Sequence, residues 1–338
     1  MRIAIVHNEV GEESRIDEKD VLIQSEAVSR ALLELNHETI TLGCSLNLDE
    51  MEGKLSSIGP DMVFNLVESL AGHGRFIHFF PGLLDAMGIP YTGSPTEVLY
   101  VTSHKVLAKE RMTHYGLATP AWRGPYPVDI PCLQEDPPQG DKETWLIKSL
   151  WEHGSLGLDD SGPISGVGFE KLDKLLVKRA PMLGKACFAE VFIPGREFNL
   201  SLLMDSDGPK VLPPAEICFE NYDDKRIKIV GYRAKWESES FEFHHTPRRF
   251  DFPPGDASLV ETLTSMAKSC WQSFGIKGYC RVDFRVDPDG LPWILEINSN
   301  PCLSPDAGFA AAVSRAGMTY TDAVSKIIAD AVYRKEVD

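Results

Sequence analysis

Oxygen-bearing side chains are spaced through two apolar segments near the end of the chain. Asp283 lies within residues 281–286, Glu296 and Asn298 lie within residues 293–301, and a tight turn separates the two segments. Burying a carboxylate without a partner costs several kcal/mol, so we expect a cation between the segments. Carboxylate and amide oxygens suit Mg²⁺, which takes one or two carboxylates and leaves its other positions to phosphate oxygens and water. The pattern therefore predicts a magnesium site that holds a phosphorylated ligand.

Arg281 belongs to the same predicted strand as Asp283. Residues two apart on a strand face the same side, so this guanidinium can reach whatever the metal holds. A fixed cation beside a metal is suited to neutralising a transferring phosphoryl group. The segment therefore indicates a nucleotide-dependent enzyme.

Two lysines are candidates for phosphate binding. Lys148 ends a short apolar strand, and a glycine-rich turn over residues 152–157 follows it. The N–H groups of such a turn can cradle phosphate while the lysine neutralises it. The alternative is a surface lysine in front of an ordinary loop, and this segment alone leaves both interpretations open. Lys105 lies near the start of a helix, where a lysine is usually solvated.

Glu190 and Glu197 flank an apolar strand and a turn. Two carboxylates at these positions can accept hydrogen bonds from an adenine amino group and a ribose hydroxyl. The alternative, which the pair taken alone favours, is two edge carboxylates paired with Arg196 and Lys185.

Two further candidates lie in predicted loops. Lys235 belongs to a charged, aromatic segment over residues 219–254, and loops of this kind often close over substrates and exclude water. The alternative is a disordered charged loop. Ser155 follows His153 closely, but no G-x-S-x-G sequence frames it as a nucleophile. We therefore predict that Ser155 contacts a phosphate or a substrate hydroxyl.

The elements that position these residues follow from the apolar pattern. In the first hundred residues strand and helix patterns alternate, which predicts a mostly parallel sheet covered by helices. No G-x-G-x-x-G follows the first strand, and the chain has no Walker A sequence. The expected strands are residues 2–7, 38–42 and 62–67, and the expected helices are residues 21–35 and 76–87.

The remaining chain reads as a boundary, a linker and a strand-rich region. The boundary is expected at residues 95–103, and residues 118–140 are rich in Pro and Gly, which predicts an extended linker. The other expected helices are residues 103–114, 170–178, 258–274 and 317–333, and strands are expected at residues 145–149 and throughout residues 186–217.

The composition argues against several functions. A net charge of −16 over 338 residues disfavours a nucleic-acid partner, which needs clustered Lys and Arg. No apolar run approaches the roughly 18 residues that span a membrane, and the N-terminus reads as a buried strand rather than a signal peptide. The seven cysteines are dispersed without a C-x-x-C pair, so we expect reduced thiols and a cytoplasmic protein.

Taken together, the motifs resemble the ATP-grasp superfamily, and most closely the D-alanine–D-alanine ligases. The likeness spans nearly the whole chain, and the ordered set of motifs is more specific than any one of them. They are Gly88-Ile89-Pro90-Tyr91-Thr92-Gly93-Ser94, the helix with Lys105, Ile147-Lys148, Gly195-Arg196-Glu197-Phe198, Ala234-Lys235, Gly278-Tyr279-Cys280-Arg281-Val282-Asp283 and Leu295-Glu296-Ile297-Asn298-Ser299-Asn300-Pro301.

The resemblance implies an α/β protein with the ATP-grasp fold, in which two lobes sandwich ATP. The implied domains are an N-terminal α/β domain over residues 1–98, a small central lobe over residues 99–184 and a large C-terminal lobe over residues 185–338. The implied ATP contacts are Lys105 and Lys148 with the phosphates, Lys235 with the γ-phosphate, Glu190 with adenine, Glu197 with ribose, and Phe192 and Ile193 along the adenine slot.

The resemblance also assigns the reacting end of the site. Asp283, Glu296 and Asn298 would hold two Mg²⁺ ions, with Mn²⁺ as an alternative, Arg281 would steady the intermediate, and Glu18 would hold the ammonium group of the first substrate. The implied activity is an ADP-forming carboxylate–amine ligase that works through an acyl phosphate on small, amino-acid-like substrates. The resembling ligases are commonly dimers, so a homodimer is expected.

The substrate side departs from the ligase pattern. Cys302 stands where the ligases have a glycine, Trp236 where they have a tyrosine, and Ala307-Gly308 where they have Ser-Leu, and residues 68–75 replace their His-Gly loop. These departures motivate two alternatives: a ligase for a different amino acid, peptide or secondary-metabolite acceptor, and an ATP-binding regulator without turnover.

Overall fold

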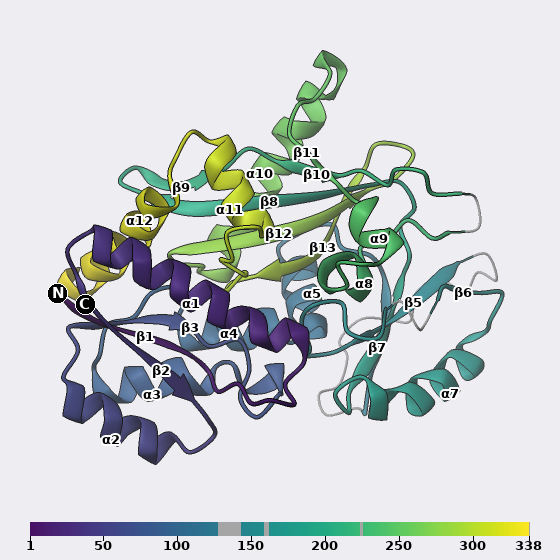
Figure 1. Cartoon of the computed structure of the whole chain (residues 1–338). Coiled ribbons are helices and arrows are strands. Elements are labelled where there is room, and N and C mark those ends of the chain that lie inside the picture. Colours follow the sequence, from purple (N-terminus) through teal and green to yellow (C-terminus); the bar gives the residue numbers. More distant parts are fainter. Residues whose placement is uncertain (128–142, 159–161, 224–225, 338) are drawn as a thin grey trace.

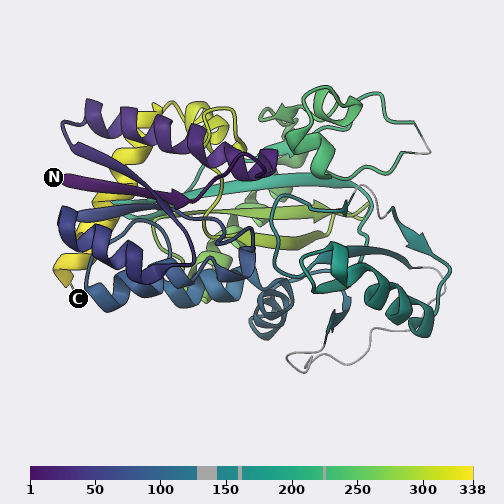
Figure 2. The same cartoon turned by 60° about the horizontal axis from the view of Figure 1, so that its bottom comes forward.

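The computed structural model describes residues 1–127, 143–158, 162–223 and 226–337, and three sheets organise them (Figure 1). Most of the predicted linker, from residue 128 to residue 142, lies outside the described residues. The N and C termini lie at the same end of the molecule (Figures 1 and 2).

The first sheet is the predicted parallel sheet. It consists of β1 (Arg2–Asn8), β2 (Glu38–Cys44) and β3 (Met62–Leu66) in the order β2-β1-β3. Alternate residues of a strand face opposite sides, so Ile3 and Ile5 join one core while Ala4 and Val6 join another. Helix α1 (Ile16–Glu34) covers the first face, and α2 (Leu48–Ile58) and α3 (Phe79–Met87) cover the second (Figure 2).

A helix pair follows where a boundary was expected. Residues 96–103 form α4 (Thr96–Ser103), and the predicted helix over residues 103–114 begins as a separate helix, α5 (Lys105–His114). Val98 and Leu99 are buried, which explains why this short segment is helical. His104 has an extended backbone and separates the two helices, while its side chain accepts a hydrogen bond from Leu107 N as the N-cap of α5.

The second sheet is small and antiparallel. Its strands are β4 (Trp122–Tyr126), β5 (Thr144–Ser149), β6 (Ile164–Ser165) and β7 (Cys187–Val191), in the order β4-β7-β5-β6. Helix α7 (Phe169–Arg179) packs on one face through Leu172 and Leu176. Strand β4 lies inside the segment predicted as a linker, and β7 lies beyond residue 184 although it pairs within this sheet.

The third sheet is the largest and carries the last two predicted strands. Its order is β11 (Arg248–Arg249), β10 (Ala215–Ile217), β8 (Arg196–Asp205), β12 (Tyr279–Val286) and β13 (Pro292–Asn298), with β9 (Gly208–Val211) paired to β8. Helix α10 (Ala257–Phe274) packs on one face, which takes Cys280, Val282 and Phe284 from β12. Arg281, Asp283 and Arg285 therefore face the other side of the sheet.

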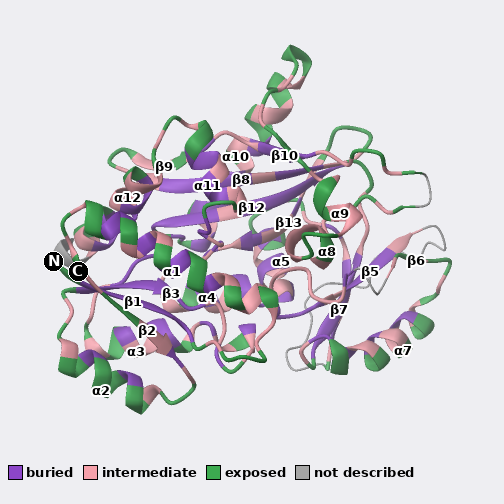
Figure 3. Ribbon diagram, viewed as in Figure 1, coloured by how far each residue is buried: buried purple, intermediate pink, exposed green. Residues whose placement is uncertain are grey.

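One core joins the first and third sheets. Ile3 and Ile5 of β1 share a buried cluster with Leu203, Tyr279 and other residues around α11 (Gly308–Arg315) and α12 (Tyr320–Val337). The small sheet has separate clusters around α7 and α5. Figure 3 shows the strands of the large sheet mostly buried and the outer faces of α2 and α7 exposed.

The charged segment between β10 and β12 is partly ordered into short helices. Its described residues form α8 (Tyr232–Trp236), α9 (Phe241–His244) and a 3₁₀ turn over Pro254–Asp256. Across the part of the chain that the structure describes, no helix combines the length and apolar character needed to cross a bilayer.

Candidate active site

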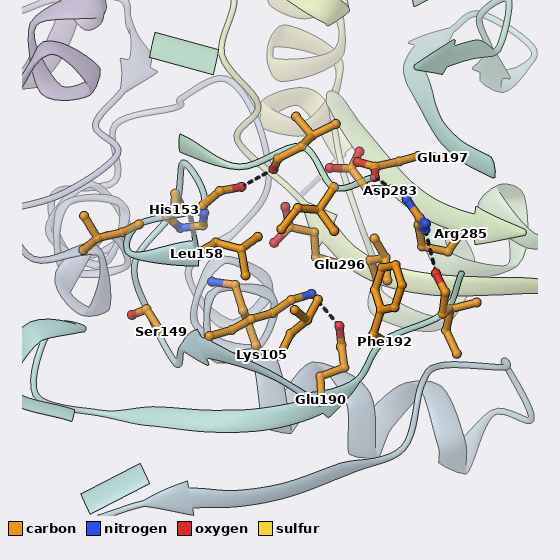
Figure 4. Close-up of a pocket in the computed structure, with 18 of the residues that line it drawn as sticks. Lys105, Ser149, His153, Leu158, Glu190, Phe192, Glu197, Asp283, Arg285 and Glu296 are labelled. Carbon is orange, nitrogen blue, oxygen red and sulfur yellow. Dashed lines mark hydrogen bonds and ion pairs between the residues drawn. The ribbon is translucent and has the colours of Figure 1, made fainter. Parts of the chain in front are cut away.

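A cavity lies between the small sheet and the large sheet (Figure 4). It is lined by the start of α5, the end of β5, the turn after β5, the end of β7, α8 and the paired strands β12 and β13. Most of the predicted site residues line it, namely Lys105, Lys148, Ser155, Glu190, Phe192, Ile193, Glu197, Lys235, Asp283 and Glu296.

The predicted metal ligands lie together on one wall. Asp283 on β12 is the register partner of Glu296 on the antiparallel strand β13. The amide nitrogen of Asn298 donates to Asp283 Oδ2 at 3.3 Å and to Glu296 Oε1 at 3.4 Å. Arg281 donates two hydrogen bonds to Asp283, at 2.7 and 2.8 Å. The donor set is therefore two carboxylates and one amide, with a guanidinium alongside.

The charge state of Glu296 is set by the lysines that face it. Burial alone would raise the pKa of this carboxyl, but Lys105, Lys235 and Lys148 together lower it well below the usual range. Glu296 is therefore ionised at neutral pH, as a ligand for a hard cation must be. Turning the Asn298 amide about its last torsion would exchange its nitrogen for its oxygen and complete an all-oxygen set.

Glu190 forms two buried ion pairs. Its carboxylate pairs with Lys148 Nζ through one oxygen and with Lys109 Nζ at 2.6 Å through the other. Both Glu190 and Lys109 are about 2% exposed or less. Burial raises the pKa of Glu190, but the two lysines outweigh it and lower the pKa, so the carboxylate stays ionised.

Glu197 pairs with a residue that the sequence reading missed. Arg285 donates from Nη1 to Glu197 Oε2 at 3.0 Å and from Nε to Ile193 O at 2.9 Å. Its guanidinium also lies 5.2 Å from the centre of the Phe192 ring. The signal was available, because Arg285 follows Arg281 and Asp283 at every second position of the same strand.

The alternative partners proposed for the two glutamates are wrong. Arg196 forms ion pairs with Glu216 and Asp256 instead of either glutamate. Lys109, the partner that sequence reading missed for Glu190, lies four residues after Lys105, which places the two lysines on one face of α5.

Gly195 fixes the turn that carries Glu197 into the cavity. It connects β7 to β8 with φ +120°, a conformation that L side chains rarely adopt. A Cβ at this position would lie 2.1 Å from Val286 O at the end of β12. Only glycine allows this close approach, which holds the turn against the large sheet.

The glycine-rich turn after β5 is tied to both neighbours. Lys105 Nζ donates to Glu152 O at 2.7 Å. Ser155, with φ +61°, donates from Oγ to Val230 O at 3.0 Å in the segment that precedes α8. The Ser155 hydroxyl therefore links the turn to the covering segment and is not paired with His153 as a nucleophile would be. Its contact with a phosphate or a substrate hydroxyl stays a prediction.

Helix α8 covers the cavity and reaches the N-terminal domain. Tyr232 OH donates to Asp17 Oδ1 at 3.1 Å, and Lys235 lines the cavity. The indole nitrogen of Trp236 would lie 3.1 Å from a Cβ at Gly154, so the ring packs on the glycine-rich turn. The described part of this segment is thus an ordered cover, contrary to the alternative of a disordered loop.

A second, smaller cavity adjoins the first on the side of the N-terminal domain. Glu18 lines it with Asn8, Arg15, Asp17, Glu68, Ser69, Gly74, Glu152, His153, Gly154 and Trp236. Glu18 accepts a hydrogen bond from Arg15 N at 2.9 Å and caps the first turn of α1. Glu152 and His153 line both cavities, so they form the wall between them.

Residues 164–329 match the protein family described as D-ala D-ala ligase C-terminus. The D-alanine–D-alanine ligase of Moorella thermoacetica is 28% identical over 330 residues, which cover 92% of this chain and 94% of that protein. The ligase of the same name from Gloeobacter violaceus is 27% identical, with 97% of this chain and 98% of that protein covered. Over nearly its whole length, the chain is similar to the D-alanine–D-alanine ligases.

Solved structures establish the same fold. The crystal structure of D-alanine–D-alanine ligase from Bacillus anthracis complexed with ATP aligns with a TM-score of 0.71 and 18% identity, covering 100% of this chain and 99% of that one. The ligase from Coxiella burnetii aligns with a TM-score of 0.70 and 16% identity, covering 99% and 96%. The expected α/β, ATP-grasp architecture is confirmed.

Cys302, one of the positions where the chain departs from the ligase motifs, lies in a hydrogen-bonded cluster. Cys302 donates from Sγ to Asp20 Oδ2 at 3.0 Å, and Ser304 donates from Oγ to the same carboxylate. Burial and the neighbouring Glu68 and Asp20 raise the pKa of the Cys302 thiol, so it is a neutral donor. Sequence reasoning missed Asp20, which lies two residues after Glu18 and joins Cys302 and Ser304 in a hydrogen-bonded cluster.

Glu68 lies at the edge of this cluster. Burial raises its pKa to about 7, against the hydrogen bond that it accepts from Gln24 Nε2 at 2.8 Å. The segment that replaces the ligase His-Gly loop thus places a weakly acidic carboxyl in the smaller cavity.

Proposed function

We propose that the chain is an ATP- and Mg²⁺-dependent carboxylate–amine ligase of the D-alanine–D-alanine ligase type, which forms a C–N bond through an acyl phosphate and releases ADP. The observation that carries the proposal is one cavity with opposed charges. Lysines from α5, β5 and α8 surround it on one side, and the oxygen ligands of β12 and β13 lie on the other. This arrangement suits ATP and a metal ion together. The lysines would neutralise the phosphates, and the carboxylates would bind the cation.

Adenosine would bind at the end away from the metal ligands. Glu190 is held ionised and buried, which suits it to accept a hydrogen bond from the adenine amino group, and Phe192 and Ile193 offer an apolar slot. Glu197, steadied by Arg285, would accept from a ribose hydroxyl. Lys105, Lys148 and Lys235 would then face the phosphates.

Asp283, Glu296 and Asn298 would hold Mg²⁺, which when bound neutralises the transferring phosphoryl group. A carboxylate substrate is a poor electrophile because its own charge repels nucleophiles. Phosphorylation turns one carboxylate oxygen into a leaving group, and Arg281 and Lys235 would neutralise charge around it. An amine would then attack and expel phosphate.

Water must be excluded while the acyl phosphate exists, because hydrolysis would waste it. Helix α8 supplies a cover, since Tyr232 and Trp236 anchor it on α1 and on the glycine-rich turn. Glu18 and its neighbours in the smaller cavity would hold the ammonium group of an amino-acid substrate.

The comparisons favour this activity over both alternatives. A regulator that only binds ATP would not need the complete set of Lys105, Lys148, Arg281, Asp283, Glu296 and Asn298. A homodimer and a cytoplasmic location belong to the proposal as well. The six cysteines in the described parts of the chain carry free thiols, which supports a reducing compartment.

The test is phosphate release from MgATP across a panel of amino acids that includes D-alanine, with product detection by mass spectrometry. We expect at least one pair to stimulate release and to yield a condensed product. A matched Glu296→Gln variant should keep some nucleotide binding and lose turnover by at least about 100-fold. Folded protein that binds ATP and responds to no pair in the panel would contradict the proposal.

A further inference from the structure

His153 occupies the wall between the two cavities and has no role in the function proposed above. It lines both of them, as Glu152 does. Figure 4 shows His153 at the larger cavity. Its Nε2 atom is buried and has no hydrogen-bond partner among the described residues. Buried polar atoms in folded proteins nearly always have a partner, so this nitrogen calls for a group on a bound molecule.

The carboxylates around the smaller cavity already accept hydrogen bonds from protein groups. Glu152 accepts a hydrogen bond from Gly74 N at 3.1 Å, and Glu18 accepts one from Arg15 N. Asp17 accepts from Arg15 and from Tyr232, and Glu68 accepts from Gln24. Trp236 also has a buried, unpartnered nitrogen, but an indole N–H only donates.

The His153 imidazole is neutral at pH 7. Burial first, and then Lys105, lower the pKa of its imidazole to about 4. Lys235 on α8 and Arg281 on β12 act in the same direction, while Glu296 on β13 opposes them. A neutral imidazole has one ring nitrogen with a free lone pair. Bound phosphate groups would offset the lysines and make that nitrogen more basic.

The position of His153 coincides with the point where the two reactants must meet. On the proposed function, the phosphoryl group comes from the larger cavity and the first substrate, whose ammonium group Glu18 would hold, from the smaller one, so the acyl carbon forms at their junction. The amine that attacks this carbon belongs to the second substrate. The amine reaches the site mainly as an ammonium ion, which has no lone pair to attack with. A proton acceptor is therefore needed at the junction of the cavities.

We propose that His153 is the general base that takes one proton from the attacking ammonium group, an inference that rests on the proposed ligase function. The freed nitrogen lone pair then forms the C–N bond at the acyl carbon. The C–O bond to the phosphoryl group breaks, and phosphate departs with the electron pair. The second proton of the nitrogen passes to the departing phosphate, and His153 returns its proton to water after product release.

Hydroxylamine separates this step from the earlier ones. It is largely neutral at pH 7 and attacks an acyl phosphate without a base, giving a hydroxamate. We compare the full-length protein with His153→Gln, using MgATP and a substrate pair identified in the panel above. In the variant we expect hydroxamate formation within about twofold of the unaltered protein, and amine ligation reduced by at least about 100-fold.

A pH series adds a readout that a structural role would not move. The remaining ligation by His153→Gln should rise about tenfold per pH unit, following the fraction of neutral amine. His114→Gln serves as a matched control, because His114 is an exposed histidine at the end of α5. His153→Asn provides a second variant should the glutamine form fail to fold.

Two results would overturn the assignment. Equal losses of hydroxamate and amide would mean that His153 acts before the acyl transfer, and unchanged amide formation would remove it from the reaction. Failure of the unaltered protein to form either product would instead contradict the ligase proposal itself, so the two failures are distinguishable.

Discussion

At the residue scale, the sequence named most of the groups around the cavity but not their partners. Glu190 and Glu197 were recognisable as carboxylates beside an apolar strand. Their partners Lys109 and Arg285 lie far from them in the chain, and only the pairing of the strands and the packing of α5 bring them together. An ion pair between distant residues leaves no local pattern to read.

Lys109 carries the residue-scale prediction. We expect Lys109→Met to lower stability by about 3–5 kcal/mol, because among the described residues it leaves the buried Glu190 carboxylate paired with Lys148 alone. The KM for ATP should rise at least severalfold, since the carboxylate that would meet adenine loses its position. Thermal unfolding and ATP calorimetry measure the two effects.

The matched control is Lys174→Met, which removes the exposed i,i+4 ion pair with Glu170. That variant should change stability by less than about 0.5 kcal/mol. Equal behaviour of the two variants would show that the buried ion pair does not support the adenine side of the cavity.

At the element scale, regular patterns were predictable and interruptions were not. Strand and helix alternation gave the first sheet correctly, because β1 and β3 are buried on both faces. A boundary was predicted at helix α4 because this helix is only about two turns long and directly follows Pro95. The order of strands in the large sheet depends on the pairing of β8 with β12, which are distant in the chain.

The contact between α8 and α1 gives the element-scale prediction. Tyr232→Phe removes one hydrogen bond to Asp17, a contribution of about 1 kcal/mol to holding the cover closed. We expect the ATP hydrolysed per molecule of product to rise about fivefold, because water would reach the acyl phosphate more often. Parallel measurement of phosphate and condensed product gives this ratio.

Tyr333→Phe is the control for this change, since Tyr333 is an exposed tyrosine on α12. It should leave the ratio unchanged. An unchanged ratio in Tyr232→Phe would mean that this hydrogen bond does not keep water from the site.

At the scale of the whole molecule, the strong negative charge and the ligand site have to be considered together. The net charge of −16 disfavours polyanionic partners, yet the cavity gathers lysines from three separate elements. Composition could exclude a nucleic-acid function, but it could not predict that a few cations would converge on one point. That convergence is a property of the three-dimensional fold.

Binding of MgATP should stabilise the whole molecule. At a ligand concentration 100 times the Kd we expect about 2.7 kcal/mol of added stability, seen as a higher Tm. Chelation of divalent ions with EDTA should remove most of this gain, because Asp283 and Glu296 would then face the phosphates without a cation. A shift in Tm that is equal with and without EDTA would contradict a metal site on β12 and β13.

The core shared by β1 and the large sheet has a mechanical consequence. Because Ile3 and Leu203 pack in the same buried cluster, the N-terminal sheet and the large sheet form a single packed unit. The small sheet, which packs with α7 around a separate cluster, forms a second unit on the other side of the cavity. On the proposed function, ATP entry and ADP exit would require the small sheet to move relative to the other two sheets, a movement that leaves their shared core intact.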